Sequence, residues 1–141
     1  MNHVAKHFPH LLVLMHAVLV GWGVLGLIEY IAPAASLGLQ NANFPAGTQF
    51  LHFAAIMATG GIFVGGYFRR WRHTPFATVL MYAVLATLCF IETVDFGAFG
   101  GGQTRFIVMG IEYVTYVGIS IFLLRSKTMR QRFSSASEVA G

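Results

Sequence analysis

Side chains that can exchange protons recur at helical spacing inside the apolar stretches of this chain. Steps of three and four residues place Tyr82, Cys89 and Glu92 on one helix face, and Glu112 and Tyr116 on another. A carboxyl group inside a membrane span costs several kcal/mol unless it is paired or neutral. Glu112, which lies well inside an apolar stretch, is therefore the strongest candidate for a functional acid.

A histidine completes this set, because His52 lies near the start of another apolar stretch. If the three polar faces converge, they enclose a pocket of the kind that small ligands occupy between helices. The predicted lining residues are His52, Tyr82, Cys89, Glu92, Glu112 and Tyr116.

Two chemistries fit these residue types. Acid–base catalysis on an apolar substrate would use Glu112 and Glu92 as the catalytic carboxyl groups, with His52 beside them. A metal site would use oxygen and nitrogen donors from His52, Glu29 and Glu92. The sequence contains no ExxH metal motif, no GxSxG motif and no phosphate-binding loop.

Haem ligation by two histidines needs two imidazoles at equal depth on facing helices. His16 lies near one end of the first apolar stretch, whereas His52 lies at the opposite membrane level, so the two should differ in depth by at least ~10 Å. A bis-histidine haem is therefore not expected. A tetrapyrrole with His16 as its single axial ligand, a quinone and a metal remain open as cofactors.

The elements that must position these residues are four apolar stretches, at residues 8–32, 50–68, 76–96 and 106–124. Each is close to the roughly 20 residues that a helix needs to cross a bilayer. With 56% hydrophobic and 10% charged residues, the composition predicts an all-α integral membrane protein: a four-helix bundle made of two helical hairpins. Residues 1–133 form its one domain, and residues 134–141 form a polar tail.

The cations predict the orientation. Eight of the nine lie on one side of the predicted membrane, and Arg105 alone lies on the other. The positive-inside rule then places both termini in the cytoplasm of a bacterial-type inner membrane. Because the cations lie at the ends of apolar stretches, we expect membrane lipids rather than nucleic acid as the surroundings.

Small residues indicate where helices can pack closely. The predicted packing stripe consists of Ala54, Ala58, Gly61 and Gly65. It could serve contacts within the chain or a homo-oligomer. At the membrane boundary, Asp95 and Arg105 are expected to form an ion pair across a glycine-rich turn.

The layout resembles the DoxX-like small membrane proteins. The resemblance rests on the four spans, the segment Gly26-Leu-Ile-Glu-Tyr-Ile-Ala-Pro33 and the pair Gly38-Leu39, and it covers about the first half of the chain. His52 stands where such proteins often carry an arginine. The resemblance implies a small partner subunit of a membrane redox or quinone-linked system.

The expected function is therefore a small accessory subunit of a larger redox- or quinone-linked membrane complex. Its size, the lack of catalytic motifs and the 14% aromatic content motivate this expectation. The alternative is a membrane-embedded enzyme that uses Glu112, Glu92 and His52 on an apolar substrate.

Overall fold

The computed structural model describes residues 3–35, 37–40, 44–96 and 102–134, and every regular element within these ranges is helical. The predicted all-α class is therefore confirmed. In chain order the elements are α1 (His3–Ile31), a short 3-10 turn η1 (Pro33–Ala35), α2 (Ala46–Arg69), α3 (Thr74–Ile91), a π-helical turn η2 (Glu92–Phe96), α4 (Gly102–Arg125) and α5 (Lys127–Ser134).

Four of these helices, α1 to α4, are long and apolar enough to cross a membrane. Their large apolar side chains face outward: Ile31 is 78% exposed, Val114 74% and Phe68 67%. Such surfaces are stable in lipid, where a helix satisfies its own backbone hydrogen bonds and needs no polar face. The chain is a multi-pass membrane protein, as its four apolar stretches predict.

Local sequence signals set the helix boundaries. Pro45 directly precedes α2, which begins at Ala46 instead of at the predicted residue 50. The helix ends at Arg69, and the next residue, Arg70, turns the chain out of the helical path with a φ of 52° and a ψ of 36°. At its far end α3 widens into η2, so Glu92 opens a π-helical turn of a kind that often occurs at functional sites.

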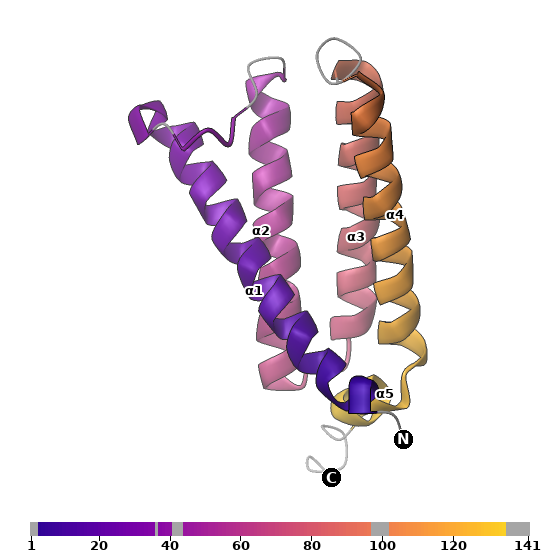
Figure 1. The fold of residues 1–141 in the computed structure, drawn as a ribbon. Coiled ribbons are helices and arrows are strands. Elements are labelled where there is room, and N and C mark those ends of the chain that lie inside the picture. The colour runs from indigo at the N-terminus through magenta and orange to yellow at the C-terminus, as the bar shows by residue number, and fades with distance from the viewer. Residues whose placement is uncertain (1–2, 36, 41–43, 97–101, 135–141) are drawn as a thin grey trace.

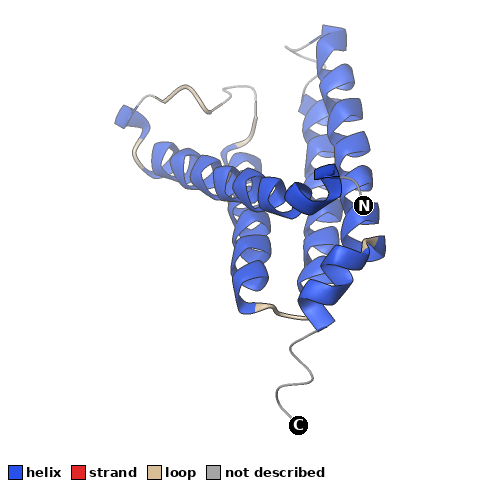
Figure 2. Ribbon diagram, turned by 60° about the horizontal axis from the view of Figure 1, so that its bottom comes forward, coloured by secondary structure: helices blue, strands red, loops and turns tan. Residues whose placement is uncertain are grey.

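The long helices are arranged around an oblique crossing of α1 and α2 (Figure 1). The first half of α1 also contacts α4, where the rings of Phe8 and Phe122 lie edge to face at 4.5 Å. Further along, α1 diverges from α3 and α4 (Figures 1 and 2), while its contact with α2 continues to Tyr30, whose ring centroid lies 5.4 Å from that of Phe50. We call this end, where α1 and α3 finish and α2 and α4 begin, the loop end. The opposite end is the arginine-rich end.

Glycines bring α1 and α2 close together. A Cβ atom at Gly60 of α2 would overlap the backbone carbonyl oxygen of His16 in α1. A Cβ atom at Gly23 of α1 would lie 2.7 Å from the backbone nitrogen of Met57. Real side chains essentially never come so close, so the crossing depends on the absence of side chains at these two positions.

The packing stripe that the sequence predicts does not make this crossing. Gly61 and Gly65 have open space at their Cβ positions, whereas their neighbours Gly60 and Gly66 meet α1 and Thr74. One residue along a helix is a rotation of about 100°. The face with Ala54, Ala58, Gly61 and Gly65 is therefore turned away from the contact that α1 makes.

A fifth helix, α5, lies across the arginine-rich end and was not predicted. Met129 and Phe133 are buried, and the guanidinium of Arg132 lies 4.3 Å from the ring centroid of Tyr67 in α2. Two apolar residues four positions apart among cations are the signal that could have revealed this amphipathic turn. Ser134 ends α5, so the rest of the predicted tail lies outside the described residues.

Candidate ligand-binding site

A histidine and a carboxylate from two helices meet at the loop end. His52 lies in the second turn of α2, and Glu92 opens η2 at the end of α3. Because α2 and α3 run in opposite directions, both residues reach the same level. Nδ1 of His52 lies 2.6 Å from Oε1 of Glu92, and Glu92 is only 3% exposed.

Arg105, in the first turn of α4, is the second partner of this carboxylate. Its guanidinium lies 3.5 Å from Oε2 of Glu92. The sequence predicted a pair between Arg105 and Asp95, but Asp95 is exposed and Arg105 contacts Glu92 instead. One buried carboxylate thus joins α2, the end of α3 and the start of α4.

This pairing fixes the orientation of the imidazole. A carboxylate accepts hydrogen bonds, so Nδ1 of His52 carries the hydrogen and donates it to Glu92. Nε2 makes no hydrogen bond with any residue that the structure describes. Neutral His52 presents Nε2 as an acceptor and protonated His52 presents it as a donor, so this atom can take up or release a proton.

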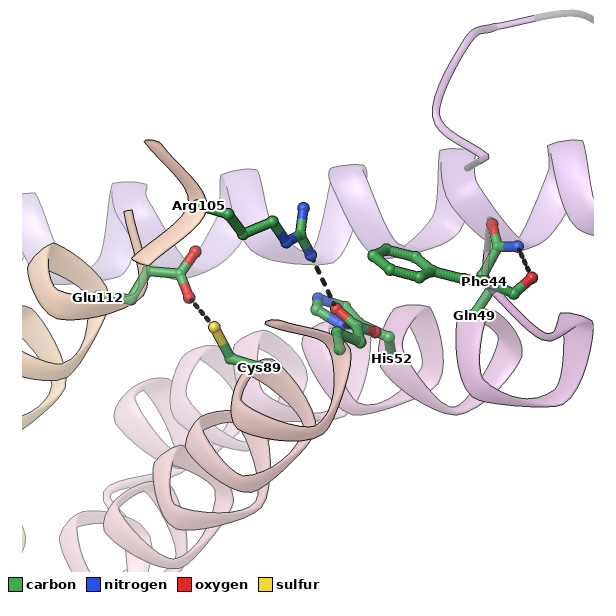
Figure 3. A network of polar contacts seen from close by, with 7 residues as sticks. Phe44, Gln49, His52, Cys89, Arg105 and Glu112 are labelled. Atoms are coloured by element: carbon green, nitrogen blue, oxygen red, sulfur yellow. Dashed lines mark hydrogen bonds and ion pairs between the residues drawn. The ribbon is translucent and has the colours of Figure 1, made fainter. Parts of the chain in front are cut away.

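Glu112 lies in a different setting. It is two helical turns beyond Arg105, about 10 Å further along α4. Its Oε2 accepts a hydrogen bond from the thiol of Cys89 in α3, with an S–O distance of 2.9 Å (Figure 3). A thiol is a weak, uncharged donor. In the described part of the chain, the guanidinium of Arg105 contacts Glu92, and no arginine or lysine contacts Glu112.

Two adjoining cavities at the loop end bring these groups together. The deeper cavity has a volume of about 320 Å³ and is lined mainly by apolar side chains, together with Cys89 and Tyr116. The cavity nearer the loops has a volume of about 580 Å³ and includes Glu92 and Arg105. The residues that line both are Trp22, His52 and Glu112.

Tyr82, which the sequence placed in the pocket, lies elsewhere. Its hydroxyl is 2.7 Å from Nε2 of His16, and its ring stacks on that of Tyr116 with centroids 5.0 Å apart. Nδ1 of His16 donates to the carbonyl of Leu12, so Nε2 must accept the hydrogen of Tyr82. Both ring nitrogens of His16 are engaged, which leaves none for an axial bond to a tetrapyrrole.

Glu29 does not join the predicted metal set either. It is buried, and its two carboxylate oxygens accept the backbone N–H groups of Gly38, Leu39 and Gln40 at 2.8, 2.7 and 3.2 Å. This carboxylate therefore anchors the segment that follows α1. Among the described residues, no group of three or more His, Cys, Asp or Glu side chains is placed to hold a metal ion.

Trp22 lines both cavities and was not among the predicted lining residues. The first span is apolar on every side, so residue spacing along α1 cannot show which face meets the other helices. The one sign in the sequence was the depth of Trp22 in the membrane, because it lies in the half of α1 that approaches the loop end.

No protein-family model matches the chain, and neither the curated proteins nor the solved structures give a match. The fold and the site together define its class. It is an α-helical, multi-pass membrane protein with a polar site between its apolar helices.

Proposed function

We propose that this protein is a small accessory subunit of a larger redox-linked membrane complex, and that its loop-end cavities bind a lipid-soluble quinone. The observation that carries the proposal is the imidazole of His52. It lines both cavities, Glu92 holds its Nδ1, and its Nε2 has no hydrogen-bond partner among the described residues.

The lining residues fit a quinone headgroup. Such a ring is flat and largely apolar, and its carbonyl oxygens accept hydrogen bonds. Trp22 and Tyr116 supply aromatic surface, and Nε2 of His52 supplies a hydrogen-bonding group. The deeper cavity, at about 320 Å³, is at the lower end of the size range of ligand pockets.

Each polar residue has a distinct role in this proposal. A bound quinone would supply electron transfer, while His52 binds a carbonyl oxygen and exchanges a proton through Nε2. Glu92 and Arg105 are positioning residues, because Glu92 accepts the hydrogen of Nδ1 and so holds the imidazole, while Arg105 holds the other oxygen of Glu92. Glu112, at the opposite wall, offers a second carboxyl group for proton exchange.

We place the helices as a four-helix bundle of two hairpins with both termini in the cytoplasm of a bacterial-type inner membrane. The site then opens toward the outer side. The support is the distribution of cations. Those at the arginine-rich side are Lys6, Arg69, Arg70, Arg72, Arg125, Lys127, Arg130 and Arg132.

The assignment as a subunit rests on the small size of the chain and on how little of it lies outside the four long helices. The resemblance to DoxX-like proteins agrees with this assignment. A quinone site at the edge of a small helical protein also needs a redox partner to deliver electrons.

A membrane-embedded enzyme is the second candidate, and one observation favours it. Glu92 and Glu112 line the same cavity in different settings, one beside an imidazole and a guanidinium and the other beside a thiol. Two carboxyl groups in unlike environments can divide the roles of acid and base.

Gentle solubilisation of the native membrane, followed by purification of the full chain, tests the proposal. We expect a second membrane protein with a redox cofactor to co-purify, and an organic extract of the complex to contain isoprenoid quinone. A chain that purifies alone, without pigment and without quinone, would contradict the subunit function and favour the enzyme.

A further inference from the structure

A groove at the arginine-rich end, far from His52, has no part in the proposed function. It encloses about 780 Å³ along one side of α2 and the turn that follows. One wall, which we call the glycine wall, is formed by Gly61 and Gly65, whose Cβ positions face open space. The other wall is the segment 69–73, which carries three arginines, Trp71 and His73.

The three arginines of this groove have no carboxylate partner in the described chain. Arg69, Arg70 and Arg72 are exposed. Among the residues that the structure describes, the one side-chain hydrogen bond from these arginines joins Nε of Arg72 to Nε2 of His73 at 2.9 Å. The described acidic residues lie at the loop end or in α4. The groove therefore concentrates positive charge that an external anion can neutralise.

The depth of the two walls indicates what kind of anion fits. Gly61 lies eight residues before Arg69, or about 12 Å along the helix. The glycine wall thus lies at the level of the hydrocarbon chains, while the arginines lie at the level of the headgroups. Trp71 is 47% exposed, and its amphipathic ring suits the interface between the two.

We propose that this groove is a binding site for an anionic phospholipid. The arginines hold the phosphate, and one acyl chain lies along the glycine wall of α2. Basic pockets at the cytoplasmic side of membrane helices bind anionic lipids by the same combination of charge and apolar surface. The open face with Gly61 and Gly65, which α1 does not cover, is then filled by lipid.

The two tryptophans allow a direct test, because they lie at opposite ends of the protein. In the W22F variant, Trp71 is the single tryptophan and reports on the groove. The full chain is placed in bilayers of phosphatidylcholine that contain a minor fraction of phosphatidylglycerol with brominated acyl chains. Bromine quenches tryptophan fluorescence on contact, so the quenching measures how strongly the lipid is enriched beside Trp71.

We expect brominated phosphatidylglycerol to be enriched about 25-fold over its mole fraction when two arginines hold its phosphate, since each arginine near the surface contributes about fivefold in affinity. The R69Q/R72Q variant should lose most of this enrichment. R125Q/R130Q, which removes two exposed cations of the same end outside the groove, should keep it. Inorganic phosphate should not reverse the quenching, because the acyl chain contributes to binding.

The G65L variant tests the contact of the acyl chain with the glycine wall. G65L should lower the enrichment about threefold by filling the groove, whereas G118L, also at an open position, should not change it. Equal quenching by brominated phosphatidylcholine, or an equal loss in R125Q/R130Q, would overturn the proposal. Reversal of the quenching by inorganic phosphate would mean that the groove binds a soluble anion. A second copy of the chain packed over Gly61 and Gly65 would mean that this face is a dimer interface. Either result would overturn the proposal of a lipid-binding site.

Discussion

Replacing Glu92 by glutamine should lower the free energy of unfolding by about 2–3 kcal/mol, the largest effect we expect from a polar substitution. The carboxylate is 3% exposed and joins His52 to Arg105 across three helices. The amide keeps the shape but removes the charge, so Arg105 loses its counter-ion and the hydrogen bond from His52 loses its charged acceptor. The effect stays below that of a fully buried pair because the side chains of His52 and Arg105 are 27% and 34% exposed.

Thermal unfolding in mild detergent, followed by circular dichroism, would show this as a fall in Tm of about 5–10 °C for E92Q. The matched control is D95N, because Asp95 lies in the same π-helical turn but is exposed. A fall of similar size in both variants would mean that the turn is sensitive to any change of charge. An unchanged Tm in E92Q would contradict the three-helix contact.

Replacing Gly60 by alanine should cost about 1–3 kcal/mol, because the added methyl group overlaps the backbone of α1. The obstacle is the carbonyl oxygen of His16, which cannot rotate away as a flexible side chain can. The helices would have to separate, and the hydrogen bond between His16 and Tyr82 would be strained as they do. The same thermal unfolding experiment measures the loss.

Gly61 provides the control for Gly60, since it has the same residue type, the same helix and open space at its Cβ position. G61A should leave the Tm unchanged or raise it slightly, because alanine favours helix over glycine. If G60A and G61A had the same Tm, Gly60 could not be the residue of α2 that faces the backbone of α1.

The spans could be predicted because each needs only length and hydrophobicity, which a single stretch of sequence carries. The meeting of His52 with Glu92 was predictable for a similar reason: antiparallel helices return to the same level, and depth follows from position along each helix. The structure also brings Cys89 and Tyr116 to the same cavity as Glu112.

The rotation of each helix about its own axis could not be predicted from the sequence. This rotation accounts for the differences between the predicted and the observed contacts of Tyr82 and of the glycines in α2. Tyr82 shares a helix face with Cys89, but the oblique path of α1 brings His16 to its hydroxyl. Gly60 rather than Gly61 contacts α1, because α2 is rotated by the equivalent of one residue from the predicted orientation. Both outcomes depend on how α1 crosses the other helices, and an all-apolar helix gives no sign of this.

Glu29 shows a second limit. A carboxylate at a helix end is usually solvated, and only the folded path of residues 38–40 brings three backbone N–H groups to it. Loop conformation of this kind follows from local hydrogen bonds that have no periodic signature. The partner of Arg105 was missed because Glu92 and Asp95 lie close together in sequence and differ mainly in direction.

Fluorescence of Trp22 tests the proposed quinone site most directly, because this residue lines both cavities and is the single tryptophan in the W71F variant. A water-soluble, short-chain quinone should quench it along a saturable curve. H52Q should weaken the affinity about tenfold through loss of the hydrogen bond from Nε2, while H10Q, at an exposed histidine of α1, should not. Quenching that rises linearly without saturation, or that is the same in H52Q, would contradict a quinone site at His52.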